Sequence, residues 1–243
     1  MLVRSAASNH RDGDEIGRHL HDWHQLVYAS AGVLTVWTER GSWIVPPHWA
    51  VWVPARVAHS IRFAGESALR TLYLRPGWTE GLPADCTAVT VSPLLRELIL
   101  RAVAIGMLDE RDRVERALAT LIADEFRQSR APPFALPQPS SPAIRKAVAL
   151  LADGPTAGLT AGALAHAVGL GRRTLERRFL AETGMSPDRW RRQARLLGAV
   201  ERLAGGQPVK TVAADAGYAS PSAFVAAFRK QFSVTPSRYF AQG

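Results

Sequence analysis

The same residue pattern occurs twice near the end of the sequence. The two copies are GLGRRTLERRFLAETGMSPDRW at residues 169–190 and GYASPSAFVAAFRKQFSVTPSRY at residues 217–239. Each copy has two apolar residues four positions apart, a proline eight positions further on and an aromatic residue three beyond that. With the apolar residues that precede it, each copy predicts a short helix, a tight turn at the glycine and a second helix. This is the helix-turn-helix arrangement.

The first copy predicts a second helix with a basic outer face. Gly169 can take the positive φ that ends the preceding helix, and the next helix begins at Arg172. Leu175 and Phe179 lie at i and i+4, so both face the core. The N-terminal half of such a helix meets base edges in the major groove. The candidate DNA contacts here are Arg172, Arg173, Glu176 and Arg177.

The second copy predicts a less charged outer face. Phe224, Phe228 and Phe232 are expected to face inward. The residues left outside are smaller, and only two of them are charged. The candidate DNA contacts from this copy are Ser220, Ser222, Ala226, Arg229 and Lys230, with Val225 beside them.

A single helix is predicted between the copies. Ser186 and Pro187 are a typical N-cap and first-turn pair, and Gly205 with Gly206 ends the apolar periodicity. The roughly 18 residues between them would form a rod of about 27 Å. One turn of B-DNA is about 34 Å, so one subunit could place two recognition helices near successive major grooves and read a bipartite site.

The positive charge of the chain is confined to the region of the repeat. Residues 142–243 contain 15 Lys and Arg against 6 Asp and Glu, a net charge of +9, whereas residues 1–141 contain 15 of each sign. A solvated basic face is the simplest explanation of an arginine cluster. Its position beside two predicted recognition helices favours a polyanionic partner instead.

Residues 142–243 resemble the DNA-binding domain of the AraC/XylS family of bacterial transcription regulators. The resemblance rests on VAADAGYASPSAF at 212–224, FRKQF at 228–232 and VTPSRY at 234–239. It implies an all-α domain whose two helix-turn-helix units bind a double-stranded operator. Ser233 stands where family members usually have Gly, and Ala226 where they often have Arg. The second recognition helix is therefore expected to contribute less direct readout than the first.

Residues 1–91 are predicted to form a β domain. Short β-branched or aromatic runs alternate with turn residues, namely Gly32, Gly41, Pro46-Pro47, Pro54 and Gly65. Many short strands at this spacing are typical of a small barrel or jelly roll. The predicted strands are 25–28, 33–38, 43–45, 50–53, 60–63 and 69–74.

This β domain resembles a cupin, and the resemblance implies a ligand set. Cupins hold a metal with two His, a Glu and a later His, which correspond here to His19, His21, Gln25 and His59. Gln25 replaces the usual acid, and a neutral amide is a weaker ligand for a hard or catalytic metal. Three interpretations remain open: a divalent metal site, a degenerate polar pocket for an organic effector, and structural histidines. Five tryptophans in the same region make an apolar effector pocket credible: Trp23, Trp37, Trp43, Trp49 and Trp52.

Residues 92–128 are predicted to form two amphipathic helices. One begins at Pro93, and the second carries its apolar series from Val114 to Phe126. In proteins that resemble this chain such helices often join subunits, so Leu118 and Leu121 are candidate homodimer contacts. Residues 129–141, with four prolines, are predicted to be an extended linker to the DNA-binding domain at 142–243.

The predicted fold class is multidomain, a cupin-like β-barrel with a helical pair followed by an all-α domain. No apolar stretch of about 18 residues and no signal-peptide pattern occurs, so a cytoplasmic protein without a membrane partner is expected. The predicted function is a one-component transcription regulator that senses a small-molecule or metal effector. The alternatives are a cupin metal-dependent enzyme with an accessory DNA-binding domain, and an architectural DNA-binding protein.

Overall fold

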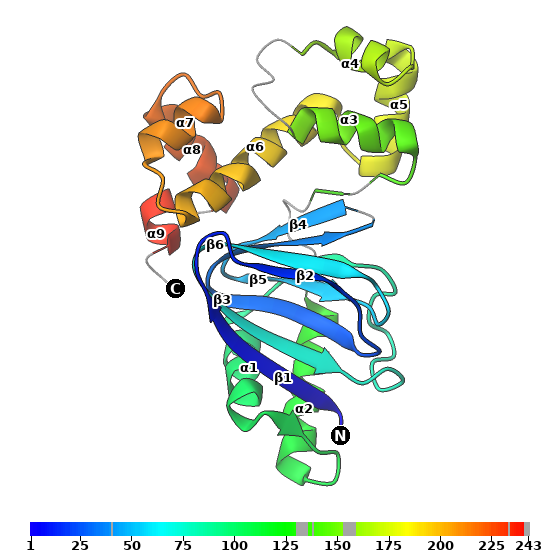
Figure 1. Ribbon diagram of the computed structural model, residues 1–243, viewed down its shortest axis with the longest axis vertical. Helices are drawn as coiled ribbons and strands as arrows, with labels where there is room; N and C mark the ends of the chain where they lie inside the picture. Colours follow the sequence, from blue (N-terminus) through cyan, green and yellow to red (C-terminus); the bar gives the residue numbers. More distant parts are fainter. Residues whose placement is uncertain (40, 130–135, 138, 153–158, 233, 241–243) are drawn as a thin grey trace. The chain divides into compact units, whose positions relative to one another are not determined.

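The computed structural model describes residues 1–39, 41–129, 136–137, 139–152, 159–232 and 234–240. The chain divides into two compact units, the first taking in most of residues 1–135 and the second most of residues 136–242. The division falls within the predicted linker at 129–141, of which residues 130–135 and 138 lie outside the described residues. The first unit combines a sheet with two helices, and the second is helical (Figure 1).

The first unit is built on one antiparallel sheet. Its strands are β1 Val3–His10, β2 Glu15–His19, β3 His24–Thr38, β4 Gly41–Val45, β5 Trp49–Val53, β6 His59–Leu74, β7 Thr87–Thr90 and β8 Met107–Leu108. The order is β7-β5-β3-β6-β1-β8, with β2 on β6 and β4 on β3. Because β3 and β6 pair along most of their length, they are the centre of the sheet.

The expected turns at Gly32 and Gly65 are wrong, because β3 and β6 run through them. Each of the two long strands joins a pair of segments that the sequence predicted as separate strands. Both glycines take positive φ, 75° and 71°, and the β3–β6 register shifts between Ala31 and Val33. Such irregularities bend a strand without ending it. The strands β1, β7 and β8 were not predicted at all.

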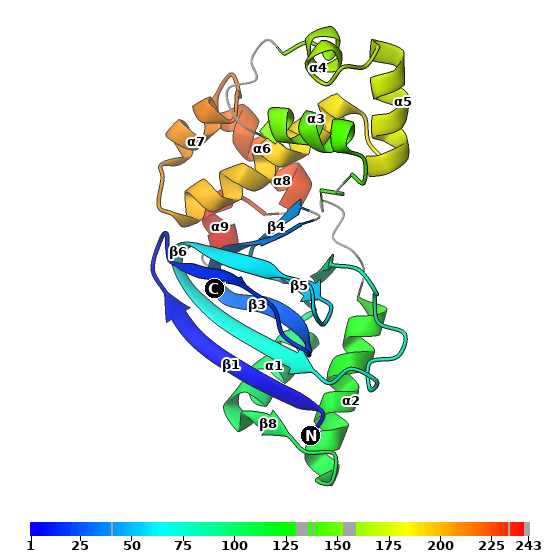
Figure 2. The same ribbon diagram turned by 45° about the vertical axis from the view of Figure 1, so that its right-hand side comes forward.

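Two helices cover one face of the sheet and complete its core. They are α1 Pro93–Ile105 and α2 Arg113–Gln128, which lie side by side in both ribbon views (Figure 2). The Ser92 hydroxyl accepts the Leu95 N–H at 3.0 Å and caps α1, and Asp112 caps α2. The apolar cluster that they share with the sheet includes Leu26, Trp52, Leu72, Leu74, Leu95, Ile99, Ile122 and Phe126.

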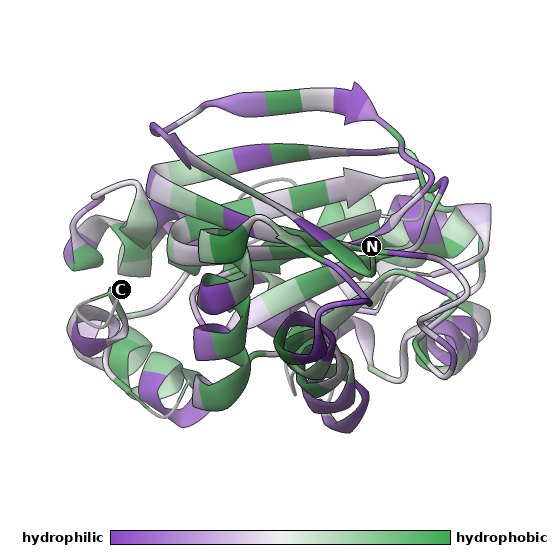
Figure 3. Ribbon diagram, turned by 90° about the horizontal axis from the view of Figure 1, so that it is seen from below, coloured by the Kyte–Doolittle hydropathy of each residue, from purple (hydrophilic) through white to green (hydrophobic). Residues whose placement is uncertain are grey.

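The two candidate dimer residues on α2 have different environments. Leu118 is only 8% exposed and belongs to the core shared with the sheet, whereas Leu121 is 49% exposed. Leu118 is therefore a core residue of its own subunit, and its assignment as a dimer contact is corrected. Hydrophobic and hydrophilic positions alternate along the helices of the structure (Figure 3).

The second unit is a set of seven helices among the described residues. They are α3 Pro142–Ala152, α4 Ala161–Ala167, α5 Arg172–Thr183, α6 Pro187–Ala204, α7 Val209–Asp215, α8 Pro221–Phe232 and α9 Pro236–Phe240. Ile144 and Leu151 of α3 are buried with Leu175, Phe179 and Trp190. Among the described residues of both units, no helix has the length and apolar character needed to cross a membrane.

Replacing Gly32 by Ala is expected to destabilise the first unit by about 3 kcal/mol. A Cβ at this position would lie 2.2 Å from Ser67 Oγ and 2.6 Å from the Glu66 carbonyl oxygen, and the φ of +75° is unfavourable for alanine. Gly17→Ala is the matched control, because a Cβ there meets nothing within 4 Å. Urea unfolding monitored by tryptophan fluorescence measures both. Equal stability of the two variants would contradict the bend at Gly32.

Candidate nucleic-acid interface and effector site

The two helix-turn-helix turns are built alike. Gly169 and Gly217 have φ of 70° and 75°, a conformation that favours glycine. The residue after each glycine donates its backbone N–H to a carbonyl five positions back, Leu170 to Ala165 at 2.9 Å and Tyr218 to Ala213 at 3.0 Å. These bonds close the ends of α4 and α7 and direct the chain into α5 and α8. The repeat predicted from sequence is therefore a structural repeat.

On α5, burial of one apolar pair leaves a charged face outside. Leu175 and Phe179 have no exposed surface. Arg172 Nε donates to Glu176 Oε1 at 2.9 Å, and this bond raises the pKa of the arginine. Arg173 and Arg177 are exposed, and neither forms an ion pair with another residue that the structure describes. These two guanidinium groups can therefore donate to an external acceptor.

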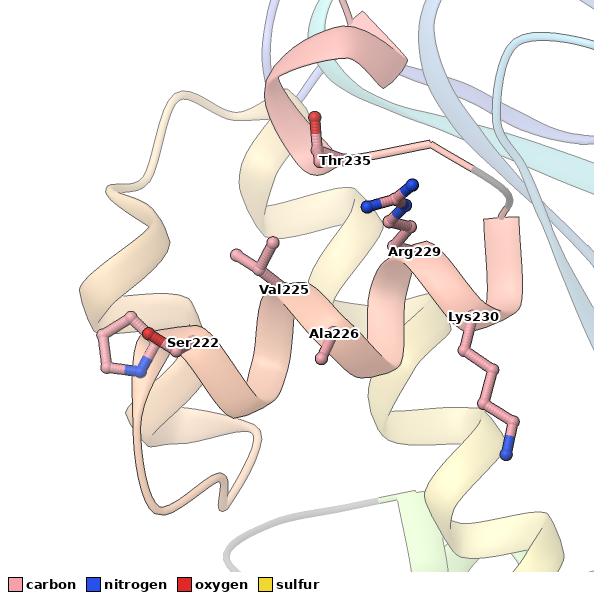
Figure 4. A pocket seen from close by; sticks show the side chains of 7 residues that line it. Ser222, Val225, Ala226, Arg229, Lys230 and Thr235 are labelled. Atoms are coloured by element: carbon pink, nitrogen blue, oxygen red, sulfur yellow. The ribbon is translucent and has the colours of Figure 1, made fainter.

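On α8, five residues form a single stripe beside an open groove. Ser222, Val225, Ala226, Arg229 and Lys230 follow the spacing i, i+3, i+4, i+7 and i+8, so they share one face. With Pro221 and Thr235 they line a groove of about 740 Å³ (Figure 4). We call these five residues the α8 stripe. Phe224 and Phe228, fully buried, lie on the other side of the helix, with Phe232 half-buried beside them.

Two residues differ from the sequence-based assignment of this face. The Ser220 hydroxyl accepts the Ala223 N–H at 3.1 Å, so Ser220 caps α8 and does not belong to the stripe. Thr235 was not predicted, yet it lines the groove just before α9. A threonine before Pro236 is a helix-start signal, which could have located α9 but not the groove.

The connecting helix α6 has the predicted length and ends. It contains 18 residues, begins with Pro187 in its first turn and ends at Gly205. The Ser186 hydroxyl accepts the Arg189 N–H at 3.3 Å. The indole of Trp190 meets the ring of Phe179 edge-on at 6.4 Å, which ties α6 to α5.

In the β unit, the predicted ligand set comes together from three strands. His19 ends β2, His21 follows it, Gln25 lies in β3 and His59 begins β6. One ring nitrogen from each histidine lies within 4.8 Å of the other two. His21 lies beyond the end of β2, but its ring still converges with those of His19 and His59. Gln25 and His59 are each 1% exposed.

Backbone carbonyls determine which nitrogen of each histidine carries the proton. His19 Nδ1 donates to Gly17 O at 2.9 Å, His59 Nδ1 to Val57 O at 2.9 Å, and His21 Nδ1 to Trp23 O. A carbonyl oxygen only accepts, so each Nδ1 is protonated. Burial lowers the pKa of His59 to about 4, so this ring is neutral at pH 7 and its Nε2 has no proton.

The amide of Gln25 presents its oxygen to these nitrogens. Thr71 has one hydroxyl proton, which it donates to Leu26 O at 3.0 Å, so its oxygen accepts from Gln25 Nε2 at 2.9 Å. This bond orients Gln25 Oε1 toward His21 Nε2 at 2.8 Å and His59 Nε2 at 2.9 Å. The Nε2 atoms of His21 and His59 therefore meet the Gln25 oxygen at the centre of the cluster.

This group of nitrogen and oxygen atoms would suit a cation. Three imidazole nitrogens and an amide oxygen are atom types that bind Zn²⁺ and related ions. Imidazole nitrogens that donate through their other nitrogen are typical ligands of first-row transition metals. His19, His21, His59 and Gln25 are the residues that could hold one.

Comparison with known proteins places the chain in a family. The AraC-like ligand binding domain family matches residues 3–166, and a helix-turn-helix domain family matches residues 164–242. The HTH-type transcriptional regulator NimR of Escherichia coli K12 is 35% identical over 224 residues, which cover 92% of this chain and 82% of NimR. The chain belongs to the AraC family of transcription regulators.

Two further similar proteins match over a smaller share of the chain or at lower identity. The HTH-type transcriptional regulator RipA of Corynebacterium glutamicum is 36% identical over 107 residues, which cover 43% of this chain and 32% of RipA. The crystal structure of ToxT from Vibrio cholerae with a bound unsaturated fatty acid covers 99% of this chain and 95% of its own, at 13% identity and a TM-score of 0.42.

The family match confirms the predicted fold class and function. This AraC-family regulator has a sheet-rich ligand-binding domain followed by a helical DNA-binding domain with two helix-turn-helix units. Its relatives are transcription regulators, which favours regulation over the enzymatic alternative.

The burial of His59 predicts a pH dependence of stability in the metal-free protein. The unfolded histidine, with a pKa near 6.5, takes up a proton that the buried ring resists down to about pH 4. The free energy of unfolding is therefore expected to be highest above pH 6.5 and to fall by up to about 3 kcal/mol as the pH drops to 4.

Urea titrations from pH 7.5 to 4.5 test this through tryptophan fluorescence, since all tryptophans except Trp190 lie in residues 1–91. His59→Gln is expected to flatten the profile, and His166→Gln, on exposed α4, to leave it unchanged. An identical profile for His59→Gln would exclude this histidine as the cause.

Proposed function

We propose that this AraC-family regulator binds a bipartite operator through α5 and α8, and that its effector site is a transition-metal centre at His19, His21, His59 and Gln25. The observation that carries the second part is the convergence of His21 Nε2 and His59 Nε2 on Gln25 Oε1, with one ring nitrogen of each of the three histidines within 4.8 Å of the others. Imidazole nitrogens with an amide oxygen beside them are suitable ligands for a first-row transition metal.

The DNA-binding part rests on the charge and exposure of the recognition faces. Arg173 and Arg177 on α5, and Arg229 and Lys230 on α8, are exposed cations in a segment of net charge +9. The ion pair between Arg172 and Glu176 keeps the Glu176 carboxylate, a hydrogen-bond acceptor, among the α5 arginines. Ser222 and Ala226 lie on the α8 stripe. The 18 residues of α6 span about 27 Å, which suits two major-groove contacts one helical turn apart.

The metal site would connect three strands that are otherwise joined by loops. His19 and His21 come from the end of β2, Gln25 from β3 and His59 from β6. A bound ion would supply a charged point to which a small organic effector could attach. Because the ion binds only when these strands are assembled, its binding free energy would stabilise the β unit.

Metal binding is expected at one ion per chain and is measured by titrating the purified full-length protein with Co²⁺ or Zn²⁺ at pH 7.5. His21→Ala and His59→Ala are expected to reduce the affinity at least tenfold, because each removes one of three imidazole ligands. His166→Ala, outside the cluster, is the matched control. Wild-type affinity in His21→Ala would refute the metal site.

The regulatory role is tested by operator binding in the metal-loaded and metal-free forms. An operator enriched from a random DNA library is expected to bind about a thousandfold or more tightly than random DNA at physiological salt. Metal is expected to change that affinity by about 5- to 150-fold, the usual range of coupling between sites. Little preference for any sequence would favour the architectural alternative, and equal affinity with and without metal would remove the effector role.

Subunit association through α2 is the third part of the proposal. Leu121 is 49% exposed and Leu94 on the neighbouring α1 is 53% exposed, which leaves apolar surface on both helices of the pair. A second copy of the chain, related by a twofold axis, would cover it in a homodimer.

Leu121→Glu is expected to shift the mass measured by light scattering from twice 26.4 kDa to 26.4 kDa, because the charge would be buried unpaired. Thr120→Glu, one position along α2 and also exposed, is the control. An unchanged mass for Leu121→Glu would exclude α2 as the dimer contact.

A further inference from the structure

The helix-turn-helix repeat allows α5 and α8 to be compared position by position. Leu175 and Phe179 of α5 correspond to Phe224 and Phe228 of α8, and all four have no exposed surface. Because these buried pairs fix the rotation of each helix about its axis, residues at equal distances from them occupy equivalent outer positions. Ser222 thus corresponds to Arg173, Val225 to Glu176 and Ala226 to Arg177.

The equivalent positions have opposite chemistry. Arg173, Glu176 and Arg177 carry three charged groups, which suit hydrogen bonding to base edges. Val225 and Ala226 present only methyl groups to the groove, with Val225 half-buried and Ala226 exposed (Figure 4). The central part of the α8 stripe can therefore neither donate nor accept a hydrogen bond through its side chains.

Charge on α8 is displaced toward its C-terminal half. Arg229 and Lys230 stand where α5 has Leu180 and Ala181, and both line the same groove. They flank the apolar pair on one side, and Ser222 flanks it on the other (Figure 4). An apolar centre bordered by cations matches a surface that contacts base edges in its middle and phosphates at its margin.

We propose that the α8 stripe recognises thymine 5-methyl groups through Val225 and Ala226, while Arg229 and Lys230 contact the flanking phosphates. The thymine methyl is the one apolar group that the bases of B-DNA present in the major groove, and alanine is a recurrent partner for it. The operator is then chemically asymmetric, with a half-site containing G·C pairs under α5 and a thymine-containing half-site under α8. This inference rests on the proposed operator binding.

Replacing thymines by deoxyuridine tests the inference, because it removes the 5-methyl group and leaves base pairing intact. Every thymine of an operator enriched from a random duplex library is replaced in turn, and the affinity of the full chain is measured at physiological salt. Wild-type protein is expected to lose about fourfold in affinity at each contacted thymine, the effect of one buried methyl group. These positions are expected to lie in a single half-site.

Protein variants assign the loss to α8. Val225→Asn combined with Ala226→Ser puts polar groups at both positions and leaves no side-chain methyl group there, and is expected to bind the thymine and deoxyuridine operators equally. Arg177→Ala is the matched control on α5. It is expected to keep the deoxyuridine loss while losing discrimination at G·C pairs in the other half-site.

The possible outcomes distinguish failure of the thymine-methyl readout from failure of the proposed operator binding. A library that enriches no sequence overturns operator binding, and the inference with it. An operator that binds equally with thymine or deoxyuridine at every position overturns the methyl readout alone and reduces α8 to a phosphate contact. A deoxyuridine loss that persists in the Val225→Asn, Ala226→Ser variant also overturns it, because the methyl effect would then act through DNA shape.

Discussion

The complete burial of one apolar pair on each recognition helix is the constraint on which the DNA-binding unit depends. Leu175 with Phe179, and Phe224 with Phe228, are separated by one helical turn and have no exposed surface. Each pair fixes the rotation of its helix, and so decides which side chains face outward. The glycines at 169 and 217 set the angle at which the chain enters these helices. Because the rotation of the recognition helix and the angle at which the chain enters it are determined in the same way in both copies, the outward-facing residues can differ between them.

In the β unit, the hydrogen bonds of a few polar groups determine how the Gln25 amide and the histidine rings are oriented. The hydroxyl proton of Thr71 goes to Leu26 O, and this one bond determines which end of the Gln25 amide faces the histidines. The backbone carbonyls at Gly17, Trp23 and Val57 determine the histidine tautomers. Each of these hydrogen bonds is ordinary, but together they direct ring nitrogens and the Gln25 oxygen toward a common centre. The substitution of Gln for the usual cupin acid therefore keeps an oxygen ligand and changes the charge of the site.

The histidine cluster, unlike the helix-turn-helix repeat, is assembled from residues that lie far apart in the sequence. His59 lies 38 positions beyond His21, and its position depends on the pairing of β6 with both β2 and β3. The bends at Gly32 and Gly65 allow these long strands to take part in that pairing along most of their length. Leu118 and Leu121 lie three positions apart on α2. Leu118 is buried in the core that α2 shares with the sheet, whereas Leu121 is exposed.

The sequence by itself determined the DNA-binding unit almost completely. Helices, turns and caps depend on contacts within a few residues, so the glycine turns, the start of α5 at Arg172 and the 18-residue α6 could all be predicted. Only the tertiary structure decided the capping role of Ser220, the groove beside Thr235, the continuity of β3 and β6 and the burial of Leu118. It also decided which atoms of Gln25 and the histidines face one another. Sheet register and side-chain protonation depend on partners distant in sequence, and no local pattern encodes them.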